Sequence, residues 1–227
     1  MNKRILASLS AFSLLALLGV QMAWASQHTF VVNDEGGRDN VTFTSDAPVE
    51  LIQGHTNQIN GTIKYDDSFH FDAGHPFEIQ FKVNLASLDT GIPLRNEHMR
   101  DNFLQTAKYP DATFKAVKIV TNAKPPFKTG QVVSITATGP FTLHGVTVSK
   151  TIPLKVTYFK ESATTHSRFP AGNMIRIQGT FPVSLKAHNI PRPEVVFLKL
   201  AENVQVSLDV FGTDKPAAKS IEGQAAK

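Results

Sequence analysis

The chain of 227 residues contains no cysteine, only one tryptophan and little excess charge of either sign. Without cysteine, neither disulfide bonds nor thiolate metal sites can hold the fold together, so a hydrophobic core must do so. The 23 basic and 19 acidic residues give a formal net charge of +4, and the basic residues are scattered along the chain. Nucleic-acid-binding domains carry a larger and more clustered positive charge, so we expect no nucleic-acid partner.

Long apolar runs are also absent, with one exception over Ile5–Val20. Lys3 and Arg4 precede this run, and Ala23–Ala25 follows it with small residues at alternate positions. This order is typical of a signal peptide, so we predict cleavage of residues 1–25 and export to the periplasm. An uncleaved membrane anchor is the alternative, but the run is shorter than the roughly 20 apolar residues that a spanning helix needs.

The rest of the chain alternates between apolar and polar residues over many short segments. In Phe77–Leu85 every odd position is apolar and every even position is polar, and Ile175–Lys186 and Val204–Val210 behave similarly. A period of two places one face of each strand in a dry interior and the other in water. The sequence therefore predicts one all-β domain over residues 26–212, an antiparallel sandwich or barrel, with a flexible tail over residues 213–227.

We expect the apolar halves of these strands to face one shared interior. The residues assigned to it are Phe77, Ile79, Phe81, Val83, Phe141, Leu143, Ile175, Ile177, Phe181, Val183, Val206 and Leu208.

An outer-membrane barrel is also exported, and its strands also alternate between apolar and polar residues, but its apolar side chains face outward to the lipid. The polar face here carries ionisable side chains, and a basic residue at the bilayer midplane costs about 2–4 kcal/mol. The apolar face therefore points inward, and we expect a protein that is not embedded in a membrane. A barrel of about eight strands can be filled by its own side chains or can hold one small ligand. The 16 phenylalanines suit either state.

One segment, about residues 93–107, breaks the strand pattern and predicts a short helix. Pro93 suits the first helical turn, and Met99, Phe103 and Ala107 lie four residues apart on one face. Tyr109-Pro110 ends the helix, because the residue before proline is pushed out of the α region. A second short helix or turn is expected over Pro193–Lys199.

Asp89-Thr90-Gly91 has the wording of the aspartic protease triplet. That chemistry needs two carboxylates that share a proton, and the sequence contains only one such triplet. As a turn at the end of a strand, Asp89 can accept backbone N–H groups and Gly91 can take a positive φ.

The eight histidines form no recognised metal motif, and His70 and His75 are the one pair that could meet across a hairpin. The nucleophile elbow, the phosphate-binding loop and the dinucleotide-binding motif are also missing from the sequence. We therefore predict no catalytic residues, no metal site and no cofactor.

Four motifs along the chain together resemble one family. They are S-[IL]-D-T-G at Ser87–Gly91, R-x-x-H-[LM] at Arg95–Met99, Y-P-x-x-x-F at Tyr109–Phe114 and G-x-[LF]-T-[IL]-H-G-V-T at Gly139–Thr147. In this order they resemble the YceI family of bacterial periplasmic lipid-binding proteins, over about residues 28 to 212. The resemblance implies a lipocalin-like β-barrel of about eight strands, with the helix at one end and a long isoprenoid chain inside.

The chain also departs from the family pattern. The usual H-S-x-[VI]-x-F strand is Arg38–Phe43 here, without the His-Ser pair, and Ala187–Pro193 replaces the late R-x-[DE]-[FY]-G stretch. We interpret the chain as a divergent member whose ligand is an apolar, polyisoprenoid-type lipid.

Two other functions remain open, namely a structural or stress-response barrel with a filled core and a hydrolase that uses the Arg95–His98 region. Arg95 and His98 are either structural locks or contacts to a ligand headgroup. As locks, Arg95 would pair with a carboxylate such as Asp89, and His98 would bond to a backbone carbonyl. A homodimer also remains open.

Overall fold

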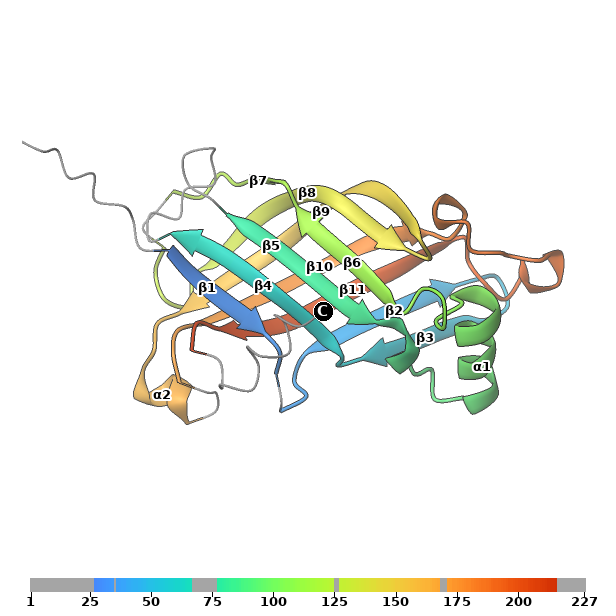
Figure 1. Ribbon diagram of the computed structural model, residues 1–227, viewed down its shortest axis with the longest axis horizontal. Helices are drawn as coiled ribbons and strands as arrows, with labels where there is room; N and C mark the ends of the chain where they lie inside the picture. Colours follow the sequence, from blue (N-terminus) through green and yellow to red (C-terminus); the bar gives the residue numbers. More distant parts are fainter. Residues whose placement is uncertain (1–26, 35, 67–76, 125–126, 168–170, 216–227) are drawn as a thin grey trace, which may run out of the picture.

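The computed structural model describes residues 27–34, 36–66, 77–124, 127–167 and 171–215 (Figure 1). The strands are β1 (Gln27–Val32), β2 (Asn40–Asp46), β3 (Leu51–Thr56), β4 (Ile59–Asp66), β5 (Glu78–Asn84), β6 (Asp111–Ala116), β7 (Lys118–Val120), β8 (Val132–Leu143), β9 (Val146–Phe159), β10 (Met174–Ser184) and β11 (Asn203–Thr213). The helical segments are η1 (Leu85–Ser87), α1 (Pro93–His98), η2 (Met99–Phe103), α2 (Ala163–His166), η3 (Lys186–His188) and η4 (Glu194–Val196).

Eight antiparallel strands form a closed barrel, which confirms the predicted fold class. Their order around the ring is β1-β4-β5-β6-β8-β9-β10-β11, and β1 closes it by pairing with β11 at Val31 and Thr213. The sequence places Thr213 in the flexible tail, but this residue ends β11, where it pairs with Val31 of β1. The hairpin β2–β3 continues the wall from the same edge of β11, where residues 205–209 pair with β2.

Strand β11 pairs with β2 at residues 205–209 and with β1 at Thr213. The backbone N–H of Phe211 lies between these two pairings. The carboxylate of Asp39 accepts this N–H, from Phe211, at 2.8 Å, and it also accepts the N–H of Asp34 at 3.2 Å. Asp39 is only 1% exposed. A buried carboxylate therefore caps the point where β1 and β2 separate.

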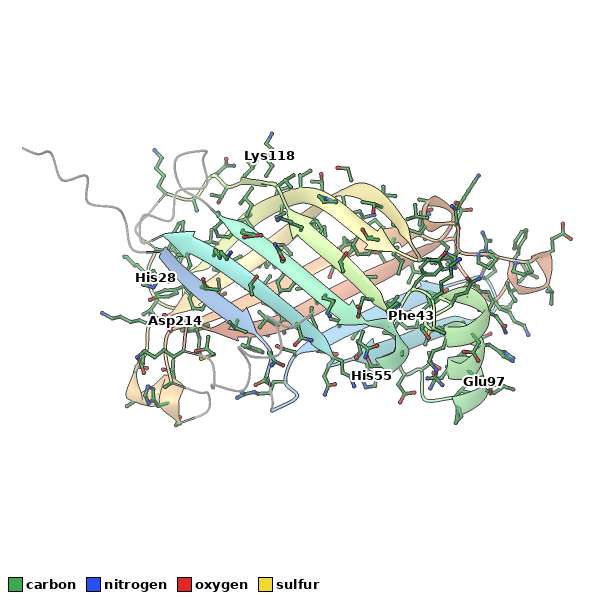
Figure 2. All side chains as sticks on the ribbon, viewed as in Figure 1. His28, Phe43, His55, Glu97, Lys118 and Asp214 are labelled. Atoms are coloured by element: carbon green, nitrogen blue, oxygen red, sulfur yellow. The ribbon has the colours of Figure 1, made fainter. Side chains whose placement is uncertain are left out.

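The barrel interior has two unlike halves. Near β1, tightly buried side chains from facing strands fill it, and Phe30 stacks on Tyr65 with ring centroids 5.0 Å apart. We call this the packed half, and it includes Phe30, Val32, Ile63, Ile79, Ile177 and Val210, all 0% exposed. Figure 2 labels His28 beside this half and Phe43 at the opposite end of the barrel. Around Phe43 the interior is hollow.

The predicted helix over residues 93–107 is present but shorter. Pro93–His98 is α-helical and Met99–Phe103 is π-helical, with the N–H of Leu104 donating to the carbonyl of Met99 at 2.8 Å. Gln105 then takes a left-handed φ of 49°, which ends the helix. Ala107 consequently lies in an exposed turn. The second expected helix, over Pro193–Lys199, reduces to the 3-10 turn η4.

Burial raises the pKa of Asp39 to about 6, against 3.8 for an ordinary aspartate. Between about pH 4 and pH 6, Asp39 therefore keeps its proton in the folded state and has lost it in the unfolded state. Stability due to Asp39 falls as pH rises through this window and is constant above it.

Asp39→Asn removes the titrating group but offers one acceptor oxygen where the carboxyl offers two to the N–H groups of Phe211 and Asp34, so we expect it to be less stable than the unmodified protein at pH 4. Between pH 4 and pH 7 its stability should rise relative to the unmodified protein by up to roughly 2–3 kcal/mol. Urea unfolding at both pH values measures the difference. Asp39→Ala, which offers no acceptor to Phe211, should cost about 1–3 kcal/mol at pH 4. Equal pH profiles for Asp39→Asn and the unmodified protein would contradict this assignment.

Candidate ligand-binding cavity

A cavity of about 540 Å³ occupies the hollow half of the barrel. Pockets of about 300–1,000 Å³ are typical of small-molecule binding sites. The cavity wall is almost entirely apolar and includes six phenylalanines from five strands and one helical segment. These are Phe43, Phe81, Phe103, Phe114, Phe141 and Phe181.

The twelve residues that the sequence assigned to the interior divide between the two halves. All twelve belong to, or pack against, one hydrophobic cluster. Eight line the cavity, namely Phe81, Val83, Phe141, Leu143, Phe181, Val183, Val206 and Leu208. Four lie outside the cavity wall, namely Phe77, Ile79, Ile175 and Ile177.

The mouth of the cavity is bordered by three segments that are distant in sequence. They are the β2–β3 turn near Glu50, the segment Thr90–His98, and the segment Val195–Leu200, of which Val196, Lys199 and Leu200 line the cavity. The backbone N–H of Val49 donates to the carbonyl of Leu198 at 3.0 Å, which joins the first segment to the third. In Figure 1, α1 and β3 lie at this end of the barrel. The same three segments carry a set of exposed side chains that we call the apolar rim: Val49, Leu51, Ile92, Leu94, Val195, Phe197 and Leu198.

Arg95 is held by the protein at this mouth. Its guanidinium donates to Glu50 Oε1 at 3.0 Å, to Thr90 Oγ1 at 3.0 Å and to the carbonyl of Thr90 at 3.1 Å. Asp89, which the sequence suggested as its partner, has other contacts. The geometry of Arg95 is that of a lock between α1, the turn at Thr90 and the β2–β3 hairpin.

Asn96 completes this lock, although nothing in the sequence pattern marks it. The side chain is buried, and its Oδ1 accepts both the N–H and the hydroxyl of Thr90, at 2.8 and 2.7 Å. Its Nδ2 donates to Asp89 Oδ1 at 2.6 Å. Asp89 also accepts the N–H of Gly91, whose φ is 76°, so the Asp-Thr-Gly triplet is a turn. The N–H of Gly91 and the amide of Asn96 hold the pKa of Asp89 below its usual range.

His98 and Lys199 are exposed side chains that also border the cavity. Within the described part of the chain, neither makes a side-chain hydrogen bond or an ion pair. Since Arg95 neutralises Glu50, these two residues are the remaining basic groups among the described residues that line the cavity. Nothing in the sequence pattern marks Lys199, because the fold brings it to the mouth from a different segment.

Two histidines close the barrel wall beside the cavity. Strands β9 and β10 pair only from Gly179 to Met174, and beyond Gly179 they diverge. There His188 Nδ1 lies 3.1 Å from the carbonyl of Val146, and His144 Nδ1 lies 3.1 Å from the carbonyl of His188. Since carbonyls only accept, each Nδ1 carries the proton. His188, from the stretch that departs from the family pattern, thus ties η3 to the β8–β9 hairpin.

Other chemistry finds no support among the described residues. They include no group of three His, Asp or Glu side chains that could hold a metal ion, and His70 and His75 lie outside them. A hydrolase would need a carboxylate or nucleophile beside His98, and none of the described side chains hydrogen-bonds to it. The predicted signal peptide, residues 1–25, also lies outside the described part.

Comparison with known proteins agrees with this architecture. A family model described as the YceI-like domain matches residues 31–211. The chain belongs to the YceI-like family. A curated relative named UPF0312 protein from Azotobacter vinelandii is 34% identical over 151 residues, which are 65% of this chain and 69% of the relative. Protein YceI of Escherichia coli O157:H7 is 37% identical over 100 residues, which are 42% of this chain and 48% of that protein.

Two solved structures share the YceI-like barrel. BcnA from Burkholderia cenocepacia aligns with a TM-score of 0.60 at 20% identity, over 80% of this chain and 99% of that one. A protein described as a polyisoprenoid binding domain from Saccharophagus degradans aligns with a TM-score of 0.60 at 18% identity, over 84% of this chain and 100% of that one. At these identities the likeness establishes the fold. Among the described residues, no helix is long and apolar enough to cross a bilayer.

Asn96 and His98, both on α1, allow a hydrogen-bonded side chain to be compared with one that makes no hydrogen bond to the described residues. Asn96→Ala leaves the N–H of Thr90 without its acceptor, so we expect it to lower the free energy of unfolding by about 1–3 kcal/mol. His98→Ala removes no hydrogen bond and should change it by less than about 0.5 kcal/mol. Chemical denaturation of both variants checks this, and a large loss in His98→Ala would show that His98 is also a lock.

Burial lowers the pKa of His188, although the carbonyls of Val146 and Leu143 favour its protonated form. Below about pH 6.5, the unfolded chain therefore takes up a proton that folded His188 resists. Stability due to His188 is present above this pH and is lost on acidification, which is the opposite of the Asp39 effect.

We expect His188→Gln to be less stable than the unmodified protein at pH 7.5 and to lose less stability on acidification to pH 5. Thermal unfolding of the two proteins at each pH measures both quantities. The comparison cancels the contribution of Asp39, which both proteins retain. Parallel pH profiles would count against a buried neutral His188.

Proposed function

We propose that this protein is a periplasmic carrier that binds a long apolar lipid of the isoprenoid type in the hollow half of its barrel. The observation that carries the proposal is the cavity, an apolar space of about 540 Å³ whose charged side chains lie only at its mouth. The description of the Saccharophagus degradans neighbour as a polyisoprenoid binding domain supports the ligand class. Export through a signal peptide cleaved after Ala25, and hence a periplasmic location, is part of the same proposal.

Burial of the hydrocarbon provides the binding free energy. Each methylene moved from water into an apolar site gains roughly 0.8 kcal/mol before the cost of ordering the chain is subtracted. The packed half forms a floor that stops the tail, and the cavity wall offers it no polar partner along most of its length. A tail inserted from the mouth therefore leaves its polar end outside, beside His98 and Lys199.

His98 and Lys199 are the proposed headgroup contacts, and Arg95 is a positioning residue. The N–H groups of Arg95 already donate to Glu50 and Thr90, so a headgroup would have to break an existing ion pair to reach the guanidinium. Among the described residues, His98 and Lys199 have no side-chain hydrogen bond or ion pair that a ligand would have to break. This division assigns the lock role to Arg95 and the headgroup role to His98.

A structural barrel without ligand is the second candidate, and the packed half is the observation that favours it. In such a protein the hollow half would stay empty in the cell. The two candidates differ in whether lipid accompanies the protein when it is purified from its own periplasm.

Val83 and Ala137 provide a test with an internal control. Val83 lines the cavity, whereas Ala137 is 0% exposed and does not border it. We expect Val83→Trp to displace lipid while costing less than about 1 kcal/mol, because the new ring fills existing space. Ala137→Phe overpacks a filled region and should cost about 1–3 kcal/mol or more.

The measurement is native mass spectrometry of co-purified lipid beside thermal unfolding of the three proteins. Lipid on the unmodified protein that is missing from Val83→Trp supports the carrier. An unmodified protein that carries no lipid and takes up none from isoprenoid-containing micelles would leave the structural barrel as the better description.

A further inference from the structure

The apolar rim gathers most of the exposed apolar surface at one end of the molecule. Seven of the ten large apolar side chains that are exposed among the described residues lie on the three segments that border the mouth. The other three, Val117, Val120 and Val132, lie on or beside β7 and β8, away from the cavity. Exposed apolar side chains gathered in this way mark a surface that binds a protein, a membrane or a ligand.

The shape of the rim favours a fluid partner over a folded one. A stable protein interface buries about 800 Å² on each side and is held chiefly by residues at its centre. Here the centre of the surface is the opening of the cavity, so a folded partner would contact only a ring and would cap an apolar space. Lipid chains adapt their shape, and they can cover the ring and enter the opening at once.

The charges at the mouth suit a phospholipid headgroup layer. Among the charged residues that line the cavity, Glu50 is neutralised by Arg95, and His98 and Lys199 remain to meet phosphate groups. Farther out both signs occur, and half-buried Arg192 pairs with Glu202 and lies over the ring of Phe197. Acidic Asp101 and Glu194 are exposed, as is Glu97, which lies on the side of α1 away from the barrel (Figure 2). Attraction to an anionic surface is therefore not the driving force, and zwitterionic lipid suffices.

We propose that the apolar rim docks the barrel, mouth first, on a zwitterionic phospholipid bilayer. The rim side chains insert at the level of the headgroups, while Lys199 and His98 lie against the phosphates. In this orientation the cavity opens directly onto the hydrocarbon phase, and an apolar chain can pass between the two without crossing water. Docking goes beyond the carrier function, because it requires nothing of what the cavity holds.

Flotation with phosphatidylcholine vesicles that contain no isoprenoid tests the docking alone. The unmodified protein should float with the vesicles, and raising the salt from 0.1 to 1 M should change the bound fraction by less than about twofold. The double variant Val195→Ser/Leu198→Ser should weaken the partition coefficient by at least about tenfold. Neither residue lines the cavity, so uptake of lipid from micelles should persist in this variant.

The control is Val117→Ser/Val132→Ser, because these side chains are 71% and 58% exposed against 82% and 59% for Val195 and Leu198. It should float like the unmodified protein, and so should Val83→Trp, whose cavity is blocked. Failure of the unmodified protein to float, equal losses in the two double variants, or loss of flotation in Val83→Trp would each overturn the proposal. So would a dimer, detected by light scattering, that Val195→Ser/Leu198→Ser dissociates while vesicles bind none of the proteins, since the rim would then belong to a second copy.

Discussion

The switch of partners along β11 is the constraint on which the rest of the structure depends. At Thr213 this strand pairs with β1 and closes a narrow ring, whereas residues 205–209 pair with β2 and widen the wall. Asp39 makes the change possible, because its buried carboxylate accepts the N–H of Phe211 that neither neighbouring strand can satisfy. In the family pattern this position belongs to the His-Ser pair that the chain lacks. Asp39 occupies the serine position of that pair, and its titration makes the junction sensitive to pH.

The wider end of the barrel explains the position of the cavity. A narrow eight-stranded ring is filled by its own side chains, as it is around Phe30 and Ile177. Where β2–β3 replaces β1 in the wall, and β9 and β10 diverge beyond Gly179, the same side chains no longer meet across the interior. Short segments then close the openings. The turn at Asp89 bridges to His55 on β3, and His188 fills the gap next to β9.

Alternation predicted the strands and the inward residues well, because a period of two fixes which face of a strand a side chain occupies. It could not tell Phe81, in the cavity wall, from Ile79, in the packed half, because both face inward and differ only in depth. The helix start at Pro93 was also correct. Its π-helical end was not predictable, since it depends on a left-handed Gln105. The partner of Arg95 was missed for a different reason, as Glu50 lies 45 residues earlier and only the fold brings the two together.

The packed half closes one end of the barrel, so the cavity has a single opening at the mouth. In the proposed carrier, a ligand that enters by the mouth must also leave by the mouth, so loading and unloading are the same movement in opposite directions. Such a container has no built-in direction. The direction of net ligand transfer would be set by the difference in the chemical potential of the ligand between the donor and the acceptor. Any directionality would therefore come from those partners and not from the barrel.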